Sequence, residues 1–123
     1  MLFKDLIAVA LGGAAGATGR HLTGILARTY LGDAFPWGTF LVNIIGCFLI
    51  GTAAGLLENR EGAPWLFLVV GVLGGFTTFS AFGNETIDLI QKGDLSVAAV
   101  NIILQVAIGL AAVWGGLALT RNF

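Results

Sequence analysis

A short aromatic and polar run inside an apolar segment carries the chemistry that this chain offers. Phe79 and Phe82 stand three residues apart with Ser80 between them, directly after residues 74–78 (GGFTT). The edge of an aromatic ring carries partial positive charge, so ring edges directed at a narrow path favour an anion. For either ring, lipid contact or ordinary packing is the alternative. The run therefore predicts an ion site.

The glycines before these rings predict where the helix is interrupted. Gly71, Gly74 and Gly75 lie within five residues, and each glycine costs about 1 kcal/mol of helix propensity relative to alanine. Gly74 and Gly75 with Thr77 are therefore predicted to break the helix and to free carbonyls for a small cation. Inside a bilayer, irregular backbone is tolerated only where protein buries it or it lines a wet cavity. The break thus predicts a functional site.

Three neutral amides lie in apolar runs. Asn43 follows Val42, and its NH₂ group can donate to an anion. Asn101 and Gln105 are predicted to hydrogen-bond one helix to another, which is the usual role of an amide between membrane helices.

The ionisable groups within or beside apolar runs each have two interpretations. Arg20 either extends its guanidinium to the lipid headgroups or stands as a fixed cation at the mouth of an anion path. Glu85 and Asp88 favour interfacial capping or pairing over proton coupling. His21, the only histidine, is predicted to be interfacial rather than catalytic.

Composition excludes several classes of protein. The sequence has no Ser/His/Asp arrangement, no Cys/His ligand spacing and no Walker-type phosphate loop, so no enzyme is predicted. The formal net charge of −1 offers no basic field for nucleic acid. Cys47 is the single cysteine and lies in an apolar run, which favours a small core residue.

The elements that must position these residues are membrane spans. Of 123 residues, 57% are hydrophobic and 11% are charged, whereas a soluble domain carries about 25% charged residues. The chain is predicted to be an all-α membrane protein, with residues 1–123 forming one four-helix transmembrane domain. The first span is predicted to be uncleaved rather than a signal peptide. The predicted spans are about 6–27, 38–57, 63–90 and 95–119, and the third is broken near its middle.

Small and amide residues at helical spacing predict packing faces on three of the spans. The faces are Gly12, Gly16, Gly19 and Thr23 on the first span; Asn43, Cys47, Gly51 and Gly55 on the second; and Asn101, Gln105, Gly109, Ala112 and Gly116 on the fourth.

Positive charge is balanced between the two ends of a four-span chain. One side holds Lys4, Arg60 and Arg121, and the other holds Arg20, Arg28 and Lys92. The positive-inside rule therefore gives no orientation. Charge alone leaves a weakly determined single topology and an antiparallel pairing of two orientations equally open.

Three motifs in order resemble the Fluc/CrcB fluoride channels. They are residues 12–20 (GGAAGATGR), 38–46 (GTFLVNIIG) and 74–82 (GGFTTFSAF). The resemblance extends over the whole chain. It implies a dual-topology, antiparallel homodimer in the bacterial plasma (inner) membrane. It also implies two pores that export fluoride passively and confer fluoride resistance. The implied partners are fluoride, a second copy and membrane lipid, with no organic substrate.

The resemblance also assigns roles to residues. The fluoride pore is implied to comprise Phe79, Phe82, Asn43, Ser80 and Thr78, with both phenylalanine ring edges contacting the ion. Glu85 is implied to lie on a polar track beside the rings, and Arg20 in the vestibule. The backbone carbonyls of Gly74 and Thr77 are implied to bind a structural sodium ion at the dimer interface. The family often has hydroxyl residues where this chain has Ala81 and Gly83.

Two other functions remain as alternatives. A proton-coupled multidrug exporter needs a carboxylate within the membrane, and only Glu85 and Asp88 offer one in the third span. A non-transporting helical subunit of a larger complex would use the small-residue faces, which a homodimer explains equally well. With the resemblance, the phenylalanine pair favours the fluoride channel, and the balanced charges favour dual topology.

Overall fold

The computed structural model describes residues 1–121 and is helical almost throughout. Four helical stretches are long and apolar enough to cross a membrane, which confirms the predicted count. They are Leu2–Leu31, Trp37–Leu56, Ala63–Gln91 and Leu95–Arg121. The first extends beyond the predicted 6–27 at both ends. At 30 residues it is about 45 Å long at 1.5 Å per residue, which is longer than the hydrocarbon core of a bilayer.

The third stretch is divided into several elements, and the others are single helices. In chain order the elements are α1 (Leu2–Leu31), α2 (Trp37–Leu56), α3 (Ala63–Trp65), the π-helical η1 (Leu66–Leu73), α4 (Gly74–Phe76), α5 (Phe79–Gln91) and α6 (Leu95–Arg121). Gly32 and Gly93 follow α1 and α5 with φ of 81° and 84°. Glycine adopts this left-handed conformation without strain, so both residues suit the turns that end these helices.

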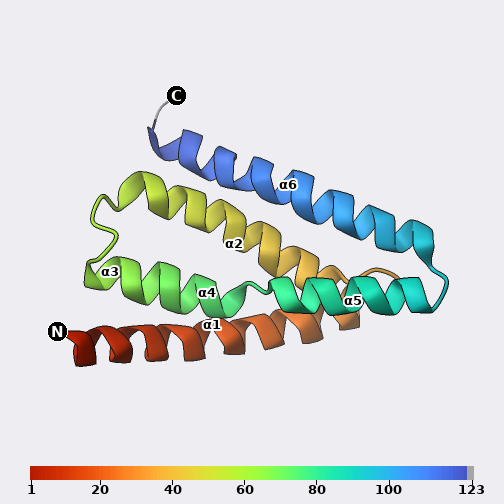
Figure 1. The fold of residues 1–123 in the computed structure, drawn as a ribbon, viewed down its shortest axis with the longest axis horizontal. Coiled ribbons are helices and arrows are strands. Elements are labelled where there is room, and N and C mark those ends of the chain that lie inside the picture. The colour runs from red at the N-terminus through yellow and green to blue at the C-terminus, as the bar shows by residue number, and fades with distance from the viewer. Residues whose placement is uncertain (122–123) are drawn as a thin grey trace.

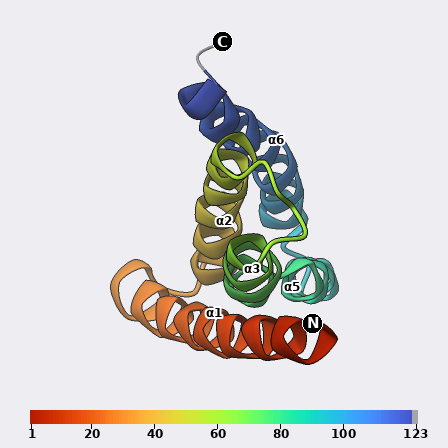
Figure 2. The same ribbon diagram turned by 90° about the vertical axis from the view of Figure 1, so that its left-hand side faces the viewer.

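The helices form two packed groups that share α2 (Figures 1 and 2). Helix α1 lies along η1 and α4, and α6 lies along α2 and also contacts α5. The start of α1, the α2–α3 connection and the end of α6 lie at one end of the molecule in Figure 1, while the other two connections lie at the opposite end. Lys4, Arg60 and Arg121 therefore belong to one end, as the charge comparison assumed.

The predicted small-residue faces are helix contacts. Gly12 and Gly16 of α1 pack against the backbone of η1 and α4. Gly51 of α2 lies against Val113 and Leu117, and Gly116 of α6 lies against the turn of α2 that contains Thr52. Because glycine has no Cβ, helices approach closely at these points.

The third stretch is broken near its middle, and the break includes Thr77 as predicted, but the glycines before it are not part of it. Gly71, Gly74 and Gly75 are all helical, and the extended residues are Thr77 (φ −86°, ψ 158°) and Thr78 (φ −154°, ψ 111°). Gly71 and Gly75 instead permit close packing against α1. A Cβ added at Gly71 would lie 2.9 Å from the Cα of Gly12 on α1. Helix propensity thus gives way to tertiary packing at these glycines.

Candidate functional site

Asn43 of α2 hydrogen-bonds both backbone groups of Thr78, one of the two extended residues of the break. Its Oδ1 accepts a hydrogen bond from the backbone N–H of Thr78 at 2.8 Å, and its Nδ2 donates to the Thr78 carbonyl at 3.1 Å. The side-chain amide therefore satisfies backbone groups that the interrupted helix leaves without their usual partners. Asn43 holds the break in its extended form.

Thr78 restarts the helix. It is the N-cap of α5, and its Oγ1 accepts from the backbone N–H of Ala81 at 3.1 Å. Threonine is one of the residues preferred at this position because its oxygen satisfies an otherwise free donor of the first turn. The same Oγ1 lies 3.3 Å from Oγ of Ser80. The sequence-predicted pore residues Asn43, Thr78 and Ser80 are thus brought together.

These contacts release two carbonyls from helical pairing. In a continuous helix, the N–H of Thr78 would pair with the carbonyl of Gly74, and the N–H of Ala81 with the carbonyl of Thr77. Those donors go instead to Asn43 and to the Thr78 side chain. The carbonyls of Gly74 and Thr77 are therefore available to a ligand, and Gly74 is exposed.

The aromatic pair stands on the first turn of α5, immediately after the break. The ring centroids of Phe79 and Phe82 are 5.5 Å apart, and the ring planes are inclined at 58°. Residues three apart on a helix share a face, so both rings lie on one side of α5. The Phe79 side chain is 82% exposed, although it belongs to a span. Phe82 is half-buried.

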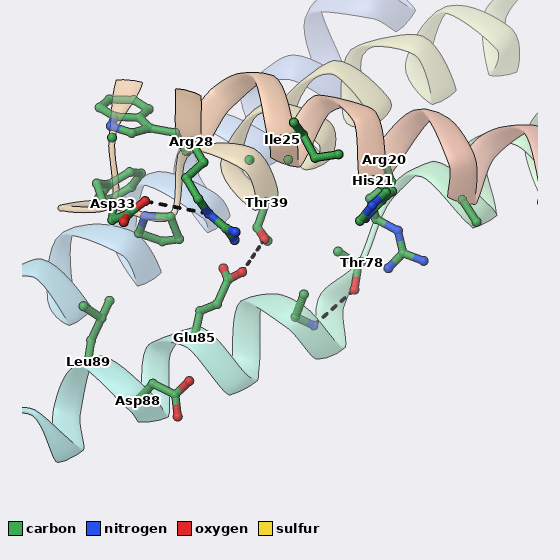
Figure 3. A pocket seen from close by; sticks show the side chains of 18 of the residues that line it. Arg20, His21, Ile25, Arg28, Asp33, Thr39, Thr78, Glu85, Asp88 and Leu89 are labelled. Atoms are coloured by element: carbon green, nitrogen blue, oxygen red, sulfur yellow. Dashed lines mark hydrogen bonds and ion pairs between the residues drawn. The ribbon is translucent and has the colours of Figure 1, made fainter. Parts of the chain in front are cut away.

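A cleft of about 700 Å³ opens between the end of α1, the start of α2 and α5 (Figure 3). Arg20 from α1 lines this cleft, and so do Thr78 at the break and Glu85 from α5. Four basic residues and three acidic residues contribute to its wall: Arg20, His21, Arg28, Lys92, Asp33, Glu85 and Asp88. Because Thr78 lines the cleft, the cleft leads to the break. Phe79 and Phe82 are not among the residues that line the cleft.

Glu85 points into the cleft and is bound by a residue that sequence reasoning missed. Its Oε1 accepts from Oγ1 of Thr39 at 2.8 Å (Figure 3). Its Oε2 is buried and has no hydrogen-bond partner within residues 1–121. Thr39 precedes Asn43 by one helical turn, so a polar stripe on α2 was the available signal. Asp88, in contrast, is exposed and accepts from Asn84 at 3.4 Å.

The other two amides connect helices, as predicted. Nδ2 of Asn101 donates to Oγ1 of Thr86 at 3.0 Å, which joins α6 to α5. Oε1 of Gln105 accepts from Nδ2 of Asn43 at 3.0 Å, which joins α6 to α2. The sequence prediction of helix-to-helix hydrogen bonding is therefore confirmed, although it did not identify Thr86.

Comparison with known proteins gives matches over nearly the full chain. A family model described as "CrcB-like protein, Camphor Resistance (CrcB)" matches residues 7–117. A relative from Agrobacterium fabrum, named "Fluoride-specific ion channel FluC", is 46% identical over 121 residues, covering 96% of this chain and 97% of the relative. Relatives of the same name from Flavobacterium psychrophilum and Cereibacter sphaeroides are 43% and 40% identical, and each covers at least 97% of this chain. The resemblance of the three motifs is thereby confirmed, and the chain belongs to the CrcB-like protein family.

Proposed function

We propose that this protein is a fluoride-selective channel through which fluoride leaves the cytoplasm passively, giving the cell fluoride resistance. The observation that carries the proposal is the Phe79–Phe82 pair, placed directly after a break whose extended backbone is hydrogen-bonded by the half-buried amide of Asn43. Relatives at 40 to 46% identity are named fluoride-specific ion channels. Family membership also favours this function over a multidrug exporter or a non-transporting subunit.

The chemistry of the site suits a small, strongly hydrated anion. Fluoride loses its water only where other donors replace it, because an ion without partners is costly in hydrocarbon. Arg20 in the cleft attracts the anion, and the hydroxyls of Thr78 and Ser80 lie near the break. The ring edges of Phe79 and Phe82 offer weak positive potential beyond them. Several weak sites in succession let an ion enter and also leave.

A second copy, antiparallel to the first, supplies the other wall of each pore in this proposal. Phe79 is 82% exposed in the single chain, so its ring has room for a partner surface. The balanced positive charge at the two ends of the molecule permits insertion in both orientations. Two such chains related by a twofold axis would form two equivalent pores, with lipid around the pair in the bacterial inner membrane.

The freed carbonyls of Gly74 and Thr77 fit a structural sodium ion. Hard cations prefer oxygen ligands, and the break withdraws from both carbonyls the N–H groups that a continuous helix would supply. In an antiparallel pair, each copy would contribute this pair of carbonyls at the interface. The ion would supply positive charge there and hold the two breaks together.

Ion release from liposomes tests the proposed function. Purified protein reconstituted into liposomes loaded with potassium fluoride should release fluoride once a potassium ionophore is added, as measured with a fluoride electrode. Liposomes loaded with potassium chloride should retain chloride under the same conditions. Retention of fluoride by the protein-containing liposomes, or equal release of both anions, would overturn the proposal.

A further inference from the structure

A line of hydrogen bonds leaves the break, passes through α2 and α6, and returns to α5. We call it the amide relay. In order, it comprises Thr78 N–H to Asn43 Oδ1 (2.8 Å), Asn43 Nδ2 to Gln105 Oε1 (3.0 Å), Gln105 Nε2 to Asn101 Oδ1 (3.4 Å), Asn101 Nδ2 to Thr86 Oγ1 (3.0 Å), and Thr86 Oγ1 to the Phe82 carbonyl (2.7 Å).

The hydrogen bonds of the amide relay all run from donor to acceptor in the same order, from Thr78 to Phe82. Each of its three amides accepts through oxygen and donates through nitrogen, so every donor meets an acceptor. The Nδ2 of Asn43 has two hydrogens, and the bonds to the Thr78 carbonyl and to Gln105 use both. A reversed Gln105 amide would place its own NH₂ against that of Asn43. Gln105 therefore supports the orientation in which Asn43 Oδ1 meets the Thr78 N–H and Asn43 Nδ2 meets the Thr78 carbonyl.

Burial makes this orientation costly to lose. Asn101 has no exposed surface, and Thr86 and Thr78 are buried. Within a membrane protein, water does not readily replace a lost partner, and an unpaired buried polar group is costly. The amide relay is thus more than the contact between pairs of helices that the sequence predicted.

We propose that Gln105 and Asn101 are positioning residues for ion conduction, although neither is required to touch the ion. They hold Asn43 in the orientation that keeps the break extended, and they tie the break to the backbone of Phe82. One end of the amide relay is Thr78 at the break, and the other is the backbone of Phe82, whose ring belongs to the Phe79–Phe82 pair. Supporting contacts of this kind keep a functional site within tight geometric limits. This inference rests on the proposed function.

The first test removes the Gln105 amide. Gln105→Met preserves chain length but leaves one hydrogen of Asn43 Nδ2 without a partner. Hydrogen exchange at the Thr78 amide, measured by NMR in detergent, should become about tenfold faster, as expected for the loss of one hydrogen bond that supports Asn43. Fluoride release from liposomes should fall by a similar factor. Ile103→Met on the exposed side of α6 is the matched control, and both readouts should stay at wild-type values.

The second test separates positioning from simple destabilisation. In Gln105→Glu, a neutral carboxylic acid accepts through C=O and donates through O–H, so it preserves the direction of the amide relay, whereas a carboxylate only accepts. The ratio of variant to wild-type fluoride release should therefore fall as pH rises. The ionisable residues on the elements packed against α6 are Cys47, Glu85 and Asp88. All three are also present in the wild type, so the ratio cancels their effect.

Each result decides one part of the inference. Unchanged exchange at Thr78 in Gln105→Met would show that Gln105 does not orient Asn43. Faster exchange with unchanged fluoride release, or a pH-independent ratio for Gln105→Glu, would overturn the positioning role. If wild-type liposomes release no fluoride, the proposed function fails and the positioning role fails with it. Exchange at Thr78 would still decide whether the amide relay orients Asn43.

Discussion

At the scale of single residues, the polar side chains around the break mostly hydrogen-bond to one another or to the neighbouring backbone. Asn43 uses both donors of its amide within the chain, and Thr78 uses its hydroxyl to begin α5. Glu85 accepts one hydrogen bond from Thr39, while its second oxygen is buried and lacks a hydrogen-bond partner within residues 1–121. The polar groups nearest the cleft are therefore fixed before any ion arrives, which is the arrangement that a selective site requires.

Thr39 provides a test at this scale. Thr39→Val removes the hydroxyl and leaves the Oε1 of Glu85 without its donor, whereas Thr39→Ser keeps it. An unpaired buried polar group costs about 1–3 kcal/mol, so Glu85 should leave its position in the valine variant. Fluoride release from liposomes should fall several-fold in Thr39→Val and stay close to the wild-type rate in Thr39→Ser. Equal rates in the two variants would show that the Thr39–Glu85 contact does not affect conduction.

At the scale of elements, the third span joins two helices of different character. Residues 66–76 pack closely on α1 through glycines, and α5 restarts from Thr78 toward α6. Hydropathy predicts the four spans because each buries a long apolar stretch in lipid. The glycines predicted a break near the middle of the third span, but they are helical themselves, and the break lies at Thr77 and Thr78. Gly71 and Gly75 remain helical because α1 packs against them, and the break is fixed by Asn43, which is 35 residues away in the sequence.

Gly71 tests the account of close packing. In Gly71→Ala the added Cβ would lie 2.9 Å from the Gly12 Cα and 3.0 Å from the Val9 carbonyl oxygen. Overpacking of this kind costs about 1–3 kcal/mol, so the thermal unfolding temperature in detergent should fall. Gly115→Ala is the matched control, because no atom lies within 4 Å of its added Cβ. The control should leave stability unchanged or raise it slightly. Equal effects of the two substitutions would contradict close packing of α1 on η1.

At the scale of the whole molecule, the proposed pores require a second copy of the chain. Most large apolar side chains on the outer faces of the helices are exposed in the single chain, and Phe79 is among them. Resemblance supplied the expectation of an antiparallel pair, because neither composition nor spacing distinguishes lipid from a partner subunit. The hydroxyls of Thr39 and Thr86 were missed for a related reason. Their partners come from other helices, so only the folded chain brings them together.

Charge balance between the two ends gives a test at this scale. Glu58→Lys with Glu61→Lys adds two positive charges to the α2–α3 connection, and Asp33→Lys with Asp94→Lys adds two at the opposite end. Positive residues near span ends set orientation, so each double variant should insert predominantly one way, as measured by labelling of an added terminal cysteine from outside the cell. Each variant alone should lose fluoride resistance in cells that lack another fluoride exporter. Coexpression of the two should restore resistance. Full resistance from a variant with a single orientation would contradict antiparallel pairing.

The most direct test of the central claim compares Phe79→Ile with Phe3→Ile in the liposome assay. Both substitutions remove one exposed aromatic ring, since Phe79 is 82% exposed and Phe3 is 75% exposed, but only Phe79 stands at the break. We expect the wild type and Phe3→Ile to release fluoride and retain chloride, and Phe79→Ile to release little of either anion. Wild-type rates of fluoride release from Phe79→Ile would contradict conduction past the Phe79–Phe82 pair.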